Sequence, residues 1–172
     1  MDELKQIISL LEEAQKLAKH NDIGNITQPG IVKEIIIADL LGHKLNSVKK
    51  QHDAVSLDGS EKYEYLTRLK GNTFQIHRIM REHCERRKIE RVTRNTCFFC
   101  ATFDRDNPLQ CIEILCVDSK WIETTVLQKC TPYFERNSNK ETYHFGILQR
   151  DIKAALDSSE AEIVWTHNNT SS

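Results

Sequence analysis

The apolar positions at the start of the chain recur with helical spacing. Over residues 2–20 they fall every three or four positions, which predicts an amphipathic helix. The polar stretch 21–28 ends this helix, and Pro29 favours the first turn of a second helix over residues 30–41. Gly42 is expected to close it. Because its apolar residues lie on most sides, we expect the second helix to be largely buried.

The middle of the chain shows the alternation typical of β-hairpins. One hairpin is predicted over residues 52–70, with its turn at 58–61, and a more apolar one over residues 94–118. Between the two hairpins, Thr73 is a suitable N-cap for a basic helix that ends near Arg91.

The last third of the chain predicts a helix over residues 119–129, a strand over 142–148, a helix over 149–156 and a strand over 162–166. We expect the tail, residues 168–172, to fray. The order α-α-β-β-α-β-β-α-β-α-β predicts an α/β (α+β) protein with a mixed central β-sheet flanked by helices. The chain has 172 residues and no long linker. We therefore expect a single domain, 1–172, in which residues 1–28 form an N-terminal helix and loop.

Composition narrows the class of protein. Hydrophobic residues make up 39% of the chain and charged residues 28%, values typical of folded rather than disordered proteins. The longest apolar runs are far shorter than the roughly 20 residues that cross a bilayer. The start of the chain is acidic and amphipathic, unlike a secretion signal, so we expect a cytoplasmic protein.

The 6 cysteines are expected to remain reduced in that compartment. Cys97 and Cys100 have the CxxC spacing of zinc ligands, but they lie in an apolar, strand-like run, and no second well-spaced Cys/His pair follows. Buried thiols that pack as small hydrophobic groups are therefore the preferred interpretation, with a structural zinc site as the alternative.

Charge is distributed unevenly, although the net charge is only −1. Residues 62–94 contain ten Lys or Arg and four Glu, a local excess of +6. A basic segment in an otherwise acidic protein favours binding to a polyanion, whereas a solvated helix face is the alternative explanation.

The first hairpin is expected to bring two acidic residues together. If its turn centres on residues 59–60, Asp53 faces Leu66 across the hairpin. Glu64 then lies diagonally from Asp53 on the same face, with the two Cα atoms about 7–8 Å apart. Two carboxylates at that separation can hold one Mg²⁺ ion. The alternative is that Asp53 caps the turn and Glu64 is a solvated strand residue.

This arrangement resembles the signature of the PD-(D/E)xK nucleases, and in particular the small type II restriction endonucleases. Asp53 and Glu64, separated by ten residues, match the two acids of the hairpin, and Glu34 matches an acid on the preceding helix. The resemblance covers residues 29–118 and implies that they form a catalytic core. It also implies that Asp53 and Glu64 bind Mg²⁺, which polarises the scissile phosphate and activates a water molecule.

Two positions differ from that signature. His52 occupies the position of its proline, which supplies no ligand. Leu66 occupies the position of its lysine and can neither donate a proton nor stabilise charge, so another residue must act there. The catalytic candidates for this role are Gln75, Lys70 and Arg68. Gln75 would project from the start of the basic helix, whereas the two cations share the face of Glu64 but start about 7 Å and 13 Å beyond position 66.

Glu34 is expected to have a functional partner, because a carboxylate among isoleucines on a buried helix is costly to desolvate. The resemblance implies that Glu34 tunes a second metal ion or a bound water. An ion pair with a nearby Lys or Arg is the alternative.

The predicted basic helix is the candidate DNA interface. His77, Arg78 and Arg81 are spaced to project toward one side of it, where they would bind phosphates or guanine edges. Phosphate contact is the commoner of these two roles.

The resemblance implies a Mg²⁺-dependent endonuclease that cleaves double-stranded DNA at a short specific sequence. It also implies a homodimer, since two-fold symmetry matches a palindromic site and supplies one active centre for each strand. The alternatives are a repair or recombination nuclease that recognises DNA structure, and an inactive DNA-binding relative, which Leu66 favours.

Overall fold

The computed structural model describes residues 3–46 and 52–167. The tail predicted to fray, 168–172, lies outside the described residues. The helices are α1 (Glu3–His20), α2 (Ile31–Leu41), α3 (Arg81–Glu85), α4 (Glu90–Thr93), α5 (Ser119–Arg136) and α6 (Gln149–Asp157). The strands are β1 (Lys44–Leu45), β2 (Ala54–Val55), β3 (Lys62–Leu69), β4 (Phe74–Met80), β5 (Cys97–Phe103), β6 (Cys111–Asp118), β7 (Thr142–Ile147) and β8 (Ala161–Thr166).

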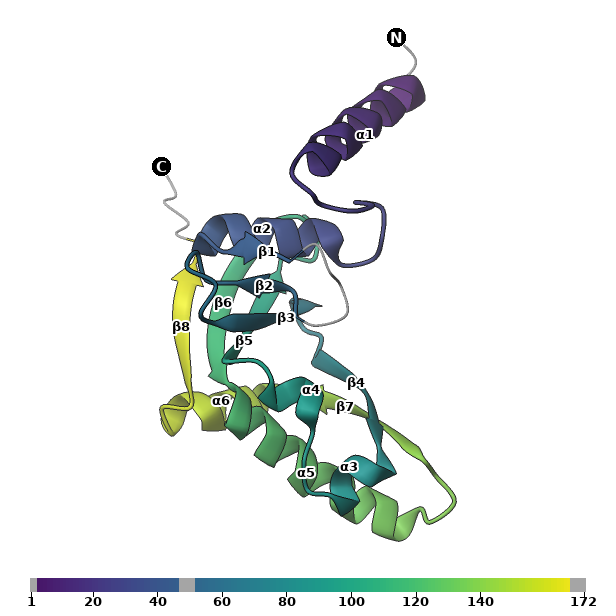
Figure 1. Cartoon of the computed structure of the whole chain (residues 1–172), viewed down its shortest axis with the longest axis vertical. Coiled ribbons are helices and arrows are strands. Elements are labelled where there is room, and N and C mark those ends of the chain that lie inside the picture. The colour runs from purple at the N-terminus through teal and green to yellow at the C-terminus, as the bar shows by residue number, and fades with distance from the viewer. Residues whose placement is uncertain (1–2, 47–51, 168–172) are drawn as a thin grey trace.

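A six-stranded mixed sheet forms the centre of the protein, in the order β1-β2-β3-β5-β6-β8 (Figure 1). Strands β3 and β5 are parallel, and the other neighbours in this sheet are antiparallel. Strands β4 and β7 form a separate antiparallel pair. The predicted fold class, a mixed sheet flanked by helices, is confirmed. Within the described residues, no helix is both long and apolar enough to span a membrane.

The two faces of the sheet bury separate groups of side chains, because successive residues of a strand point to opposite faces. On β5, Phe98 and Cys100 pack with residues of α5 and α6, whereas Phe99 and Ala101 pack with residues of α2. We call these sides the α5 face and the α2 face. All seven residues of β5 are buried, so this strand contributes to both cores.

The alternation of side chains along β5 also decides whether the two cysteines of the CxxC spacing can bind one zinc ion. Cys97 belongs to the core on the α2 face and Cys100 to the core on the α5 face. Their side chains therefore point to opposite sides of the sheet. Two thiols in this arrangement cannot converge on one zinc ion, which supports the interpretation that they pack as small hydrophobic groups.

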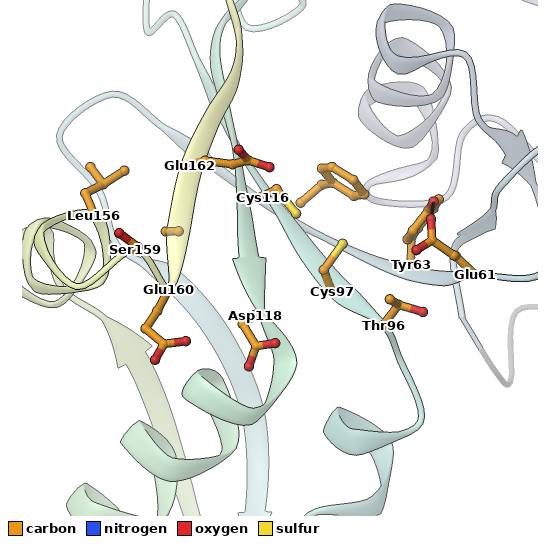
Figure 2. A pocket seen from close by; sticks show the side chains of 12 residues that line it. Glu61, Tyr63, Thr96, Cys97, Cys116, Asp118, Leu156, Ser159, Glu160 and Glu162 are labelled. Atoms are coloured by element: carbon orange, nitrogen blue, oxygen red, sulfur yellow. Dashed lines mark hydrogen bonds between the residues drawn. The ribbon is translucent and has the colours of Figure 1, made fainter.

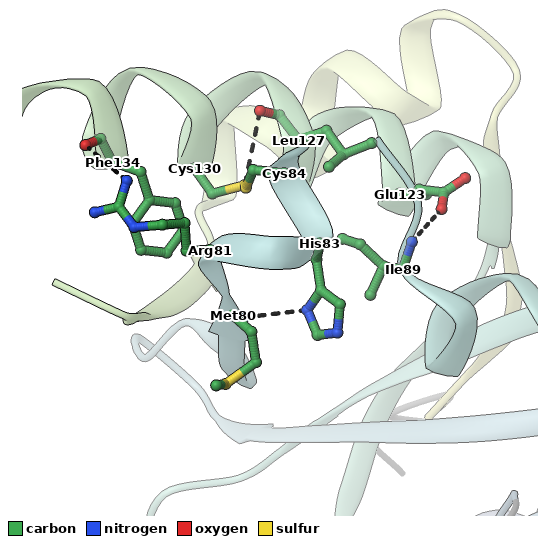
Figure 3. The surroundings of a disulfide bond; sticks show 9 residues. All are labelled: Met80, Arg81, His83, Cys84, Ile89, Glu123, Leu127, Cys130 and Phe134. Atoms are coloured by element: carbon green, nitrogen blue, oxygen red, sulfur yellow. Dashed lines mark hydrogen bonds between the residues drawn. A yellow bond between two sulfur atoms is a disulfide. The ribbon is translucent and has the colours of Figure 1, made fainter. Parts of the chain in front are cut away.

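The expectation that all 6 cysteines remain reduced is wrong. Cys84 and Cys130 form a disulfide with a Cα–Cα distance of 6.8 Å, linking α3 to α5 (Figure 3). The two residues are 46 positions apart in the sequence. Their pairing results from the packing of α3 against α5, which spacing along the chain does not indicate.

The basic helix predicted from Thr73 to Arg91 is also wrong. Its first part is strand β4, which pairs with β7, and only the short helices α3 and α4 follow. Phe74, Ile76 and Ile79 are at most 5% exposed. Burying these large side chains against β7 and α5 outweighs the weak local preference for a helix. A register shift between Ile76 and Ile79 keeps both in the core although their spacing is odd.

The remaining predicted elements are confirmed with small changes in their ends. Helix α2 ends at Gly42, whose φ of 67° is the left-handed conformation expected at a helix end. Helix α5 continues past the predicted end at 129 to Arg136, with Pro132 inside it. Strand β1 was not predicted, because two residues are too few to produce an alternating pattern.

Candidate active site

The register of the β2–β3 hairpin decides whether the two acids meet. Ala54 pairs with Tyr63 and Val55 with Lys62, a shift of two residues from the predicted register. The cause is the turn, in which the amide of Ser56 donates to the carbonyl of Glu61 at 3.2 Å and thereby closes a longer loop than expected.

A shift of two residues leaves every side chain on its predicted face, because the side-chain period of a strand is two. The pairing of the two strands covers Ala54 and Val55, and Asp53 directly precedes β2. Asp53 and Glu64 therefore keep the common face that the prediction gave them, and both line one pocket.

Both acids line a pocket of about 510 Å³ on the α5 face of β3. The pocket is bounded by the hairpin, the first turn of α2 and the segment from β4 to α4. Its lining residues are Gly30, Glu34, Asp53, Glu64, Tyr65, Leu66, Thr67, Gln75, Ile76, Arg91, Val92, Arg94 and Phe98. The structure thus brings together four of the predicted catalytic residues: Glu34, Asp53, Glu64 and Gln75.

The backbone of β3 holds Asp53 in place. Its carboxylate Oδ2 accepts a hydrogen bond from the amide of Tyr65 at 2.8 Å, and its own amide donates to the carbonyl of Tyr63 at 2.9 Å. The carboxylate therefore has a fixed position across the strand, beside Glu64. The amide it satisfies belongs to a strand rather than to the turn, so the proposed role as a turn cap does not describe this residue.

Glu64 is in an unusual electrostatic environment. Burial is the main reason why its pKa is raised to about 7, and the negative charge of Asp53 raises it further. The positive charges of Arg94 and Arg91 oppose this increase, and Glu34 adds to it. Two adjacent carboxylates, one of them poorly hydrated, form a site where a bound cation would relieve the repulsion.

Glu34 reaches the pocket from the first turn of α2. Gly30, directly before that helix, has a φ of 92°, and a Cβ atom at this position would lie 3.2 Å from Oε1 of Glu34. Glycine therefore permits both the backbone conformation and the close approach of the carboxylate.

Two of the three candidates for the missing lysine do not reach the pocket. Arg68 is 9% exposed; its Nε donates to Oγ1 of Thr102 at 3.0 Å, and its guanidinium lies 4.3 Å from the ring centroid of Phe74. Lys70 is exposed beyond the end of β3 and is not among the residues that line the pocket. Only Gln75 lines the pocket, and it lies on β4 rather than at the start of a helix.

The pocket also contains two cations that the sequence did not single out. Arg91 lies in α4 and Arg94 directly follows it, and the charges of both act on Glu64. Burial lowers the pKa of Arg91, while the charge of Glu64 opposes this decrease. The basic excess over residues 62–94 was a signal of such residues. The prediction of one long helix was the reason why Arg91 was not assigned to the site, because such a helix places Arg91 at its far end, away from the hairpin.

The three predicted DNA-binding residues do not share a helix face. Arg81, the first residue of α3, binds the segment that follows α5: its guanidinium donates to the carbonyls of Asn137, Ser138 and Lys140 at 2.7–2.9 Å. It also lies 5.0 Å from the ring centroid of Phe134. These contacts give Arg81 a structural role. Arg78 is exposed at the register shift of β4, with a φ of 61°, and His77 lies beside it on the same strand.

A second pocket, of about 640 Å³, lies on the α2 face at the opposite side of the sheet (Figure 2). It contains the thiols of Cys97 and Cys116 and a set of acidic residues, Glu61, Asp118, Glu160 and Glu162. None of its lining residues is Lys or Arg. A pocket with this negative charge would repel a phosphate, so the pocket that contains Asp53 and Glu64 is the better candidate for binding nucleic acid.

Among the described residues, no group of three or more His, Cys, Asp or Glu side chains is assembled as a metal site. A pair of carboxylates nevertheless fits Mg²⁺, which commonly takes one or two protein carboxylates and completes its shell with water and substrate oxygens. Asp53 and Glu64 form such a pair.

No protein-family model matches the chain, and no curated protein matches it. The interpretation of the site therefore depends on its residues and their arrangement.

The raised pKa of Glu64 predicts a pH-dependent effect on stability. Its pKa is about 7 in the folded protein and 4.5 ordinarily, so its contribution to stability is present below pH 4.5 and is lost as the pH rises through 7. In metal-free buffer at pH 8, Glu64→Gln should therefore raise the free energy of unfolding by about 1–3 kcal/mol. Urea unfolding at pH 8 and pH 4 measures this. An equal gain at both values would contradict the assignment of Glu64 as the titrating group.

Proposed function

We propose that this protein is a Mg²⁺-dependent endonuclease, similar to the PD-(D/E)xK nucleases, that cleaves double-stranded DNA at a short specific sequence. The observation that carries the proposal is that Asp53 and Glu64 line one pocket, close enough for the charge of Asp53 to act on Glu64, together with Arg91 and Arg94. The proposal includes a homodimer with one active centre for each strand and a location in the cytoplasm.

Six of the polar residues that line the pocket would have distinct parts in this reaction. Asp53 and Glu64 would hold the Mg²⁺ ion, and the bound ion would polarise the scissile phosphate and activate the attacking water. Arg91 and Arg94 would bind the phosphate and balance the charge of the acids. The side-chain amide of Gln75 would orient the water, and Glu34 would accept a hydrogen bond from it.

The burial of Glu64 would make the binding of Mg²⁺ depend on pH. At a pH below about 7 the carboxyl is protonated, and a proton competes with the cation for the same oxygens. Arg91 and Arg94 limit this competition, because their positive charges keep the pKa of Glu64 from rising further.

Leu66 favours a second candidate function, an inactive DNA-binding relative. It occupies the position of the catalytic lysine and packs against the core on the α5 face, so no cation emerges from this point of β3. In that case Arg91 and Arg94 would bind DNA without cleavage.

Incubation of the full chain with plasmid DNA and Mg²⁺ tests these functions. Discrete bands would support a restriction endonuclease, whereas smears or cutting at DNA junctions would support a repair or recombination nuclease. Binding without any nicking, in Mg²⁺ or Mn²⁺, would support the inactive relative and overturn the endonuclease. EDTA provides the control, because removal of the metal should abolish every cut.

A further inference from the structure

Helix α1 carries a broad apolar face that the other described residues, up to 46 and from 52 to 167, leave exposed. Figure 1 shows it extending away from the sheet and its helices. Five apolar side chains along it are between 50% and 62% exposed: Ile7, Ile8, Leu10, Leu11 and Leu17. Together they leave on the order of 500 Å² of apolar surface open to solvent, which is large for the surface of a monomer.

The last turns of α1 attach the helix to the body of the protein. Ala18 is buried with Ile26 and Ile31, and Gln15 exchanges hydrogen bonds of 3.0 Å with the backbone of Gly24 and Ile26. This attachment fixes the direction of the helix. The exposed apolar face is therefore held in a defined position relative to the body.

The spacing of this face suits pairing with another helix. Leu4, Ile7, Leu11 and Ala14 are exposed and are separated by steps of three, four and three, the repeat that aligns apolar residues along one helix for contact with a second one. The exposed apolar surface of α1, on the order of 500 Å², is more than half of the ~800 Å² that each partner of a stable complex typically buries.

The charges of α1 favour a protein partner over a membrane. Glu3, Glu12 and Glu13 balance Lys5, Lys16 and Lys19, and the apolar residues of the helix are all aliphatic. A helix that binds anionic membranes instead carries an excess of Lys and Arg with Trp or Phe anchors.

The ends of α1 are complementary to each other. Glu3 lies in the first turn, and Lys19 and His20 lie in the last. When two copies pair in an antiparallel arrangement, the acidic end of one helix meets the basic end of the other. The dipoles of the two helices then point in opposite directions, which is a favourable electrostatic arrangement. Such a contact uses the same surface on both copies, as two-fold symmetry requires.

We propose that α1 is the self-association surface of this protein and that two copies pair through antiparallel α1 helices. The inference rests on the proposed function only in that the endonuclease is expected to be a homodimer. It adds the surface through which the second copy binds.

Light scattering and sedimentation of the full chain over a wide range of concentrations test this inference. The wild type should have twice the monomer mass of 20.0 kDa. Ile7→Glu/Leu11→Glu should be monomeric, with a dissociation constant raised about 100-fold or more. Gln6→Glu/Ser9→Glu adds the same charge to the polar side of the helix and should remain dimeric. Circular dichroism should show that all three proteins are folded.

The antiparallel arrangement has its own test. Glu3→Lys and Lys19→Glu should each weaken the dimer, and the double variant should restore it, because the exchanged charges face each other again. Failure to restore it would overturn the antiparallel arrangement.

Three outcomes would overturn self-association through α1. These are a monomeric wild type, a dimeric Ile7→Glu/Leu11→Glu variant, and a monomer that binds lipid vesicles through this face. Cleavage of plasmid DNA, measured on the same samples, separates this inference from the proposed function. A dimer that never cleaves would contradict only the nuclease, and a monomeric wild type that cleaves would contradict only the dimer.

Discussion

Asp53→Asn is expected to reduce Mg²⁺-dependent DNA cleavage by roughly 10³-fold or more. The substitution removes one of the two charges that would hold the ion, while an amide oxygen can still accept the hydrogen bond from the amide of Tyr65. The fold should therefore survive. Removal of a neighbouring charge also lowers the pKa of Glu64, because the charge of Asp53 raises it in the native site. Initial rates of plasmid cleavage, with thermal unfolding measured in parallel, provide the test.

Glu162→Gln is the matched control for this experiment. It removes one carboxylate charge from an exposed position on β8, in the pocket on the opposite face of the sheet. Its cleavage rate should stay within about twofold of the wild type, because surface substitutions away from the site have small effects. A wild-type rate for Asp53→Asn would remove the carboxylate pair from the mechanism.

Arg91→Met should reduce cleavage by about 10²–10³-fold if Arg91 supplies the positive charge that Leu66 cannot. Methionine retains much of the apolar side-chain stem and removes only the guanidinium. Because the charge of Arg91 lowers the pKa of Glu64, its loss should also move the lower limb of the pH–rate profile to higher pH. Cleavage rates between pH 5 and pH 9 measure both effects.

Arg86→Met serves as the control for Arg91. Arg86 is an exposed arginine that forms an ion pair with Glu82 at 3.8 Å, outside the pocket. Its removal should leave both the rate and the pH profile unchanged. If Arg91→Met behaves in the same way, another residue replaces the lysine, and Gln75, which lines the same pocket, is the next to substitute.

The hairpin shows which parts of the site sequence can predict. The turn residues of the first hairpin located the reversal, but their number did not give the correct register. The common face of Asp53 and Glu64 was nevertheless predicted, because an error of two residues preserves the alternation of a strand. An error of one residue would have placed the acids on opposite faces.

The segment from Thr73 to Arg91 shows where local pattern fails. Its charged residues resemble a solvated helix, yet Phe74, Ile76 and Ile79 form a strand whose partner, β7, lies more than sixty residues later in the chain. Propensity is a weak local preference, whereas pairing with a distant strand buries large apolar side chains. The same error displaced Arg91 from the site and gave Arg81 a role in DNA binding that its contacts with the end of α5 do not support.

By itself, the sequence determined the elements whose pattern is local: helices α1, α2 and α6, the two hairpins, and the shared face of the two acids. The tertiary structure decided the contacts between distant segments: the pairing of β4 with β7, the disulfide between Cys84 and Cys130, and the position of Arg91 beside Glu64. The physical reason is that periodicity reports which side of an element is buried, whereas the partner that buries it depends on the packing of the whole chain.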